Sequence, residues 1–126
     1  MKEYFGKHIT LDCFDSDPEA ILDTELIARF LTECVSRVNM KVIREADSFY
    51  YENEEDPLGS GVTATIILST SLASIHTFKR YSYFSFDLFS CRDFDADALL
   101  EYVREVFSPG SVEVNVNLRG RGYFRS

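Results

Sequence analysis

The sequence predicts an α+β fold in which a mainly antiparallel sheet carries both helices on one face. Three observations lead to this prediction. Alternating apolar residues indicate half-buried strands, two segments with apolar residues at helical spacing indicate amphipathic helices, and the strands occur in runs rather than in regular alternation with helices. We therefore expect a two-layer α/β sandwich with the order strand, helix, four strands, helix, strand.

The first strand is predicted between residues 4 and 14, where Ile9, Leu11 and Cys13 share one face. The segment 16–19 predicts the start of the first helix, with Ser16 or Asp17 as N-cap and Glu19 placed for a capping box. The apolar stripe of that helix comprises Leu26, Ile27, Phe30, Leu31, Cys34, Val35 and Val38. Cys13 and Cys34 are therefore expected to be buried core thiols.

The middle of the chain reads as four strands, at residues 41–51, 61–69, 74–77 and 81–90. A second helix is predicted after Phe94, with Asp95 as N-cap and a hydrophobic staple between Phe94 and Leu99. It is expected to end at residues 108–110, before a last alternating strand at 111–118. The predicted order contains no repeat and no interdomain linker.

The bulk properties limit the classes of function. A chain of 126 residues fits one domain, 1–126. It has no apolar run long enough to span a bilayer and no apolar segment at its N-terminus, so we expect no membrane partner. Three irregularly spaced cysteines indicate neither a disulfide framework nor a metal site, and we expect a reducing, cytoplasmic location. A net charge of −8 argues against nucleic-acid binding.

The residues with the most chemical content lie between Ser71 and Cys91. An apolar run at residues 66–68 leads into a predicted turn that contains Ser71, and His76 and Cys91 follow within twenty residues. Together they supply a hydroxyl, an imidazole and a thiol. Taken alone, each also has a structural interpretation, as a turn residue, a core histidine and a buried thiol.

Five blocks in order carry a family resemblance. The chain resembles the short bacterial and archaeal form of the S-adenosylmethionine decarboxylase proenzyme over nearly its whole length. The matching blocks are Gly6-Lys7-His8, Gly61-Val62-Thr63, residues 71–77, Asp87-Leu88-Phe89-Ser90-Cys91 and Arg119-Gly120-Arg121.

The resemblance implies a self-cleaving, pyruvoyl-dependent enzyme that supplies polyamine (spermidine) synthesis. Cleavage would fall between Thr70 and Ser71, and Ser71 would become a pyruvoyl group that forms a Schiff base with the substrate amine. By the same resemblance Thr63 and His76 assist processing. Cys91 returns a proton to the product, a role that suits a thiol because an ordinary thiol keeps its proton at neutral pH.

The chain departs from the family pattern at the cleavage site and at the substrate site. Thr70 and Leu72 flank Ser71 where the family has Glu and His. Arg80 stands where the family has a Glu that binds the ribose hydroxyls, and an arginine has no acceptor for them. The aromatic residue that stacks on adenine has no clear counterpart, although Tyr50 or Tyr51 is a candidate.

Three hypotheses of function follow. The first is a pyruvoyl-dependent decarboxylase acting on S-adenosylmethionine or on another amino acid. The second is an unprocessed, non-catalytic homologue that serves as a binding or regulatory subunit. The third is a small-molecule-binding or structural homodimer unrelated to decarboxylation. We expect a homodimer, because the aromatic residues of the 81–90 strand exceed what one small core hides.

Overall fold

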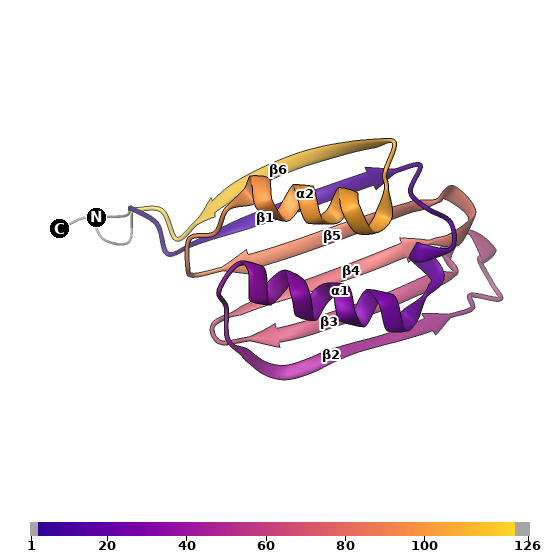
Figure 1. Cartoon of the computed structure of the whole chain (residues 1–126), viewed down its shortest axis with the longest axis horizontal. Coiled ribbons are helices and arrows are strands. Elements are labelled where there is room, and N and C mark those ends of the chain that lie inside the picture. The colour runs from indigo at the N-terminus through magenta and orange to yellow at the C-terminus, as the bar shows by residue number, and fades with distance from the viewer. Residues whose placement is uncertain (1–2, 123–126) are drawn as a thin grey trace.

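The computed structural model describes residues 3–122 and contains a six-stranded antiparallel sheet with two helices on one face (Figure 1). The order of the strands across the sheet is β2-β3-β4-β5-β1-β6. The elements are β1 (Gly6–Phe14), α1 (Thr24–Arg37), β2 (Val42–Tyr51), β3 (Gly61–Leu68), β4 (Ser71–Phe78), β5 (Tyr83–Ser90), α2 (Ala96–Phe107) and β6 (Ser111–Arg119). The predicted α+β class, the order of elements and the placement of both helices are confirmed.

The core lies between the sheet and the helices. The alternation predicted for the first strand is present, since Ile9, Leu11 and Cys13 have no exposed surface. The helices contribute the buried residues Ile27, Phe30, Leu31, Cys34, Val35, Leu99, Val103 and Phe107. Burial raises the pKa of the Cys13 thiol and of the Cys34 thiol to about 12 each, so both remain neutral core residues.

The start of the first helix differs from the prediction. Asp17 does accept backbone hydrogen bonds, since its Oδ1 accepts from the N–H groups of Glu19 and Ala20 at 2.9 and 3.3 Å. These bonds precede a short 3₁₀ turn, Ala20–Leu22, whose N-cap is Glu19, and α1 begins only at Thr24. Asp23 is the true N-cap, because its extended backbone breaks the helical path and its side chain accepts from the N–H of Leu26 at 3.0 Å. The predicted capping box does not form.

The second helix begins as predicted. Asp95 accepts from the N–H groups of Asp97 and Ala98 at 3.0 and 3.2 Å. The helix ends at Ser108, which has a left-handed backbone with φ of 45°. Phe94 and Leu99, the proposed staple, are both buried.

Two strand boundaries and one packing argument need correction. The strand predicted at 74–77 extends from Ser71 to Phe78, and the next begins at Tyr83 because a 3₁₀ turn (Lys79–Tyr81) and a left-handed Ser82 precede it. Fewer aromatic side chains of that strand are exposed than expected, since Phe84 and Phe86 are completely buried. Tyr81 is 55% exposed and belongs to the turn.

The face of the sheet opposite the helices, here called the open face, is not covered by any element within residues 3–122 (Figure 1). Its polar centre comprises His8, Thr10, Asp12, Thr63, Thr65, Ser74, His76, Ser85 and Asp87. Exposed apolar residues surround this centre, namely Phe14, Phe49, Tyr51, Ile67 and Leu72. In the described part of the chain, no helix has the length and apolar character needed to cross a membrane.

Candidate functional site

The turn between β3 and β4 places Ser71 next to a strained residue. The sequence predicted that Ser71 lies in the turn. It is instead the first residue of β4 and pairs with Leu68. Ser69 and Thr70 form the turn, and Thr70 has φ of 58°. This left-handed conformation is a rare outlier for a β-branched residue, and such turns usually use Gly or Asn. The Thr70–Ser71 peptide bond therefore follows a residue held in an unfavourable conformation.

Cys91 contacts both sides of that peptide bond. Its Sγ donates a hydrogen bond to the carbonyl oxygen of Thr70 at 3.3 Å, and its backbone N–H donates to Ser71 Oγ at 3.3 Å. The contact arises because β4 and β5 pair antiparallel with Leu72 opposite Phe89. Cys91, the residue that follows β5, therefore lies beside Thr70. One residue thus holds the hydroxyl and polarises the carbonyl that the hydroxyl would attack.

Thr63 and His76 form a second group on the open face. They are register partners on β3 and β4, and Thr63 Oγ1 lies 3.1 Å from His76 Nδ1. His76 is five residues from Ser71 along β4, a separation of about 16 Å at the usual rise of a strand. The predicted site residues therefore divide into two pairs, and the fold does not bring His76 or Thr63 to Ser71 within one chain.

Two further polar contacts on the open face were not singled out from the sequence. His8 Nε2 lies 2.9 Å from Asp87 Oδ1, and the hydroxyl of Tyr83 donates to Asp12 Oδ1 at 2.5 Å. Partial burial, together with the Asp12 carboxylate, raises the pKa of Tyr83 to about 12. The alternation that buries Ile9 and Leu11 was the available signal, because it directs His8 and Asp12 to the opposite face.

The candidate substrate residues Arg80, Tyr50 and Tyr51 lie far along the sheet from Ser71. Arg80 belongs to the exposed 3₁₀ turn that follows β4, at the end opposite Ser71. Tyr51 pairs with Gly61 and is exposed on the open face. The Tyr50 hydroxyl donates to the Glu52 carboxylate, and this bond raises its pKa. Within one chain, none of the three is near the Ser71–Cys91 pair.

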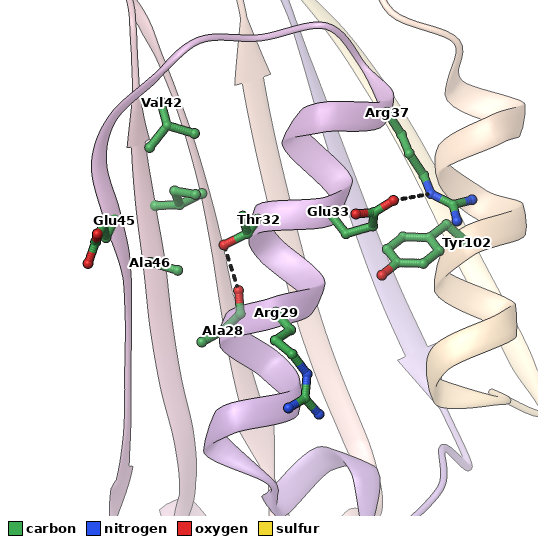
Figure 2. A pocket seen from close by; sticks show the side chains of 10 residues that line it. Ala28, Arg29, Thr32, Glu33, Arg37, Val42, Glu45, Ala46 and Tyr102 are labelled. Atoms are coloured by element: carbon green, nitrogen blue, oxygen red, sulfur yellow. Dashed lines mark hydrogen bonds and ion pairs between the residues drawn. The ribbon is translucent and has the colours of Figure 1, made fainter.

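A groove of about 730 Å³ lies on the helix side of the sheet, between α1 and β2 (Figure 2). Small side chains such as Ala28 and Ala46 leave it open. Along its rim, the Nε of Arg37 donates to Glu33 at 3.3 Å, and the Arg37 guanidinium lies 4.0 Å from the centroid of the Tyr102 ring. None of the site residues predicted from the sequence lines this groove, so it is separate from the Ser71–Cys91 pair.

Comparison with known proteins identifies the family. The family model described as S-adenosylmethionine decarboxylase matches residues 7–120. The chain belongs to the S-adenosylmethionine decarboxylase family. An S-adenosylmethionine decarboxylase proenzyme from Clostridium botulinum (strain Langeland) is 26% identical over 120 residues, which cover 94% of this chain and 97% of that relative. One from Thermosipho africanus is 28% identical over 118 residues, covering 92% and 85%.

A solved structure shares the family fold. The crystal structure of the adenosylmethionine decarboxylase from Aquifex aeolicus matches with a TM-score of 0.79 and 25% sequence identity, covering 99% of this chain and 98% of that one. The decarboxylase family fold therefore extends across almost all of the chain.

Proposed function

We propose that this chain is a pyruvoyl-dependent decarboxylase that cleaves itself between Thr70 and Ser71. The observation that carries the proposal is the double contact of Cys91 with Ser71 Oγ and with the Thr70 carbonyl. Cys91 is only partly buried, and a thiol without a function needs no such arrangement around a strained peptide bond. Membership of the decarboxylase family makes self-cleavage the chemistry that this arrangement fits best.

Self-cleavage would begin with an attack by Ser71 Oγ on the carbonyl carbon of Thr70. The hydroxyl proton passes to the Ser71 nitrogen, the C–N bond breaks, and an ester joins Thr70 to Ser71 Oγ. The Cys91 thiol stabilises the negative charge that develops on the carbonyl oxygen. Removal of the Ser71 Cα proton then expels the Thr70 carboxylate, and water releases the nitrogen as ammonia to leave a pyruvoyl terminus.

Ser71 and Cys91 fit the pyruvoyl group by position and by chemistry. Such a group supplies a carbonyl that binds the substrate amine and accepts electrons while the carboxylate departs. Ser71 is half-buried at the end of the sheet, which leaves one side open to a small molecule. Cys91 is the proposed donor of the proton that replaces the departing carboxylate.

We also propose that two copies of the chain build the site. Thr63 and His76 cannot reach Ser71 in the same chain, whereas a second copy packed on the open face brings its own Thr63–His76 pair toward it. Exposed apolar side chains at the ends of the open face support this assembly, since Ile67 and Leu72 are 48% and 45% exposed. Cys13, Cys34 and Cys91 form no disulfide within residues 3–122, which supports a reducing, cytoplasmic location.

The proposed substrate is a compact amino acid in preference to S-adenosylmethionine. Arg80 offers only donors where the family resemblance implies an acceptor for ribose hydroxyls. Lys79 beside it adds a second cation, which repels a sulfonium substrate.

Intact-mass measurement of the purified chain, followed by assays of carbon dioxide release, tests the proposal. We expect two fragments divided at Thr70/Ser71, none in Ser71→Ala, and turnover of at least one of arginine, ornithine, lysine and S-adenosylmethionine. Cys91→Ala should process slowly and turn over poorly. A single uncleaved species without decarboxylase activity would instead support the non-catalytic homologue.

A further inference from the structure

The C-terminal end of β6 places a cation at the same end of the sheet as the Ser71–Cys91 site. Arg119 is the register partner of Gly6, and its carbonyl accepts from the N–H of Phe5 at 2.8 Å. On the other side of β1, Lys7 pairs with Ser90, so Gly6 lies one step farther along, beside Cys91. Continuing this register by one residue beyond β5 places Arg119, Gly6 and Cys91 in one row, two strand spacings or about 10 Å wide.

Gly6 makes room for the side chain of Phe89. A Cβ at this position would lie 2.7 Å from the carbonyl oxygen of Ser90 and 2.8 Å from the Phe89 ring, so the ring packs directly over the glycine backbone. The guanidinium carbon of Arg119 lies 6.0 Å from the centroid of that ring. Phe89 is two residues from Cys91 and on the same face, about 7 Å away along the strand.

Arg119 has no carboxylate partner within residues 3–122. The nearest acid on the same strand as Phe89 is Asp87, and this carboxylate is paired with His8 at 2.9 Å. Lys7, another cation at this end of the sheet, is turned to the helix side, where its Nζ donates to the carbonyl of Phe94 at 3.2 Å. In a chain with a net charge of −8, the Arg119 guanidinium is thus an available cation at the candidate site.

We propose that Arg119 binds the α-carboxylate of the amino-acid substrate, an inference that rests on the proposed decarboxylase function. Every amino-acid substrate carries this group, and a guanidinium holds a carboxylate by two parallel hydrogen bonds. The Phe89 ring, 6.0 Å from the guanidinium carbon, helps to hold the guanidinium at this end of the sheet. Arg119 is proposed to hold the carboxylate about equally in the bound substrate and in the transition state, so its loss acts mainly on KM.

The test compares Arg119→Gln with Arg121→Gln, which removes the same charge two residues away. Each variant is first checked by intact mass for normal cleavage. KM and kcat are then measured with whichever of arginine, ornithine, lysine and S-adenosylmethionine the wild type decarboxylates best. The inhibition constant of the corresponding amine product, which lacks only the carboxylate, is measured alongside.

Arg119→Gln should raise KM about 10- to 100-fold, the usual effect of losing a charge-assisted pair, with kcat within about two-fold of the wild type. Binding of the amine product should not change. Arg119→Lys should recover part of the loss, and Arg121→Gln should resemble the wild type.

An unchanged KM in Arg119→Gln would overturn the inference. An equal loss of affinity for the amino-acid substrate and for its amine product would also overturn it, because it would indicate that the contact of Arg119 with Phe89 has a structural role. Either result with an active wild type leaves the proposed decarboxylase function intact. A wild type that decarboxylates none of the four amino acids removes both.

Discussion

Thr63 and His76 are hydrogen-bonded partners that face away from the residue they are proposed to assist. Their side chains meet at 3.1 Å on the open face, whereas Ser71 begins the same strand five residues earlier. A strand is too rigid to close a gap of about 16 Å. If His76 takes part in the cleavage at Ser71, it must therefore come from a second copy of the chain.

Complementation between two inactive variants tests this arrangement. Ser71→Ala cannot cleave, and His76→Ala should cleave at least tenfold more slowly, as expected for loss of an acid–base group. When the two are co-expressed, mixed dimers contain one complete site, in which an intact Ser71 meets an intact His76 from the partner. Mass spectrometry should then detect cleavage of the His76→Ala chain.

Thr63→Ala paired with Ser71→Ala gives a second version of the same experiment, and His76→Ala expressed alone gives the control. Cleavage that stays slow in the mixture would assign His76 to its own chain or to no role. A monomer of about 14.5 kDa in light scattering would remove the dimer itself.

The backbone of Thr70 gives a prediction about strain. Its φ of 58° suits Asn far better than a β-branched residue. In the uncleaved Ser71→Ala background, Thr70→Asn should increase the free energy of unfolding by about 1 kcal/mol. With Ser71 present, the same substitution should slow cleavage, because relaxed backbone geometry no longer favours the attack on the carbonyl.

Denaturant unfolding and a time course of intact mass measure the two effects. Ser82→Asn is the matched control, since Ser82 also has a positive φ, of 48°, but lies at the other end of the sheet. It should leave the cleavage rate unchanged. Faster cleavage in Thr70→Asn would show that strain at this residue does not promote the reaction.

The layers of the fold could be predicted from the sequence because a half-buried strand and a half-buried helix each require apolar residues at a characteristic spacing. Ile9, Leu11 and Cys13 alternate as a strand must, and the stripe through Leu31 repeats as a helix must. Local capping chemistry was less decisive. Asp17 and Asp23 both accept backbone hydrogen bonds, and only packing of the chain decides which of them begins α1.

The candidate site was predictable in composition but not in geometry. The resemblance selected Ser71, His76 and Cys91, yet the contact between Cys91 and Ser71 depends on the register of two strands across twenty residues. The separation of His76 from Ser71 was hidden because the strand was predicted too short, from residue 74 instead of 71. Arg119 went unassigned because only the strand pairing shows that it lies at the same end of the sheet as Cys91.

Leu31 tests the packing of α1 on the sheet. Its side chain is completely buried, so Leu31→Asp should reduce the free energy of unfolding by several kcal/mol and cause unfolding or aggregation. Ser36→Asp, on the exposed side of the same helix, should change it by less than about 0.5 kcal/mol. A cooperative thermal transition of Leu31→Asp near that of the parent would contradict the assignment of Leu31 to the core.

Alkaline pH should destabilise the fold through its buried thiols. Burial raises the pKa of Cys34 from 9.0 to about 12, so above pH 9 the unfolded chain loses a proton that the folded chain keeps. Stability is therefore fully present below about pH 9 and decreases as pH rises toward about 12. In the Ser71→Ala background, Cys34→Ala should weaken this pH dependence by up to about 1.4 kcal/mol per pH unit. Identical slopes from about pH 8 to about pH 11 would exclude Cys34 as a contributor.

Arg80 provides a test of substrate choice by gain of function. If its position governs recognition of the ribose hydroxyls, Arg80→Glu restores an acceptor. The substitution should then raise kcat/KM for S-adenosylmethionine about tenfold relative to the best compact amino acid. Lys79→Glu makes the same change in charge at the neighbouring residue and is the matched control. Equal gains in both variants would indicate a general attraction of the sulfonium by negative charge, and no gain in either would place the selection of substrate elsewhere in the site. A gain confined to Arg80→Glu would show that one residue, at the end of β4 opposite Ser71, separates this chain from its relatives in substrate use.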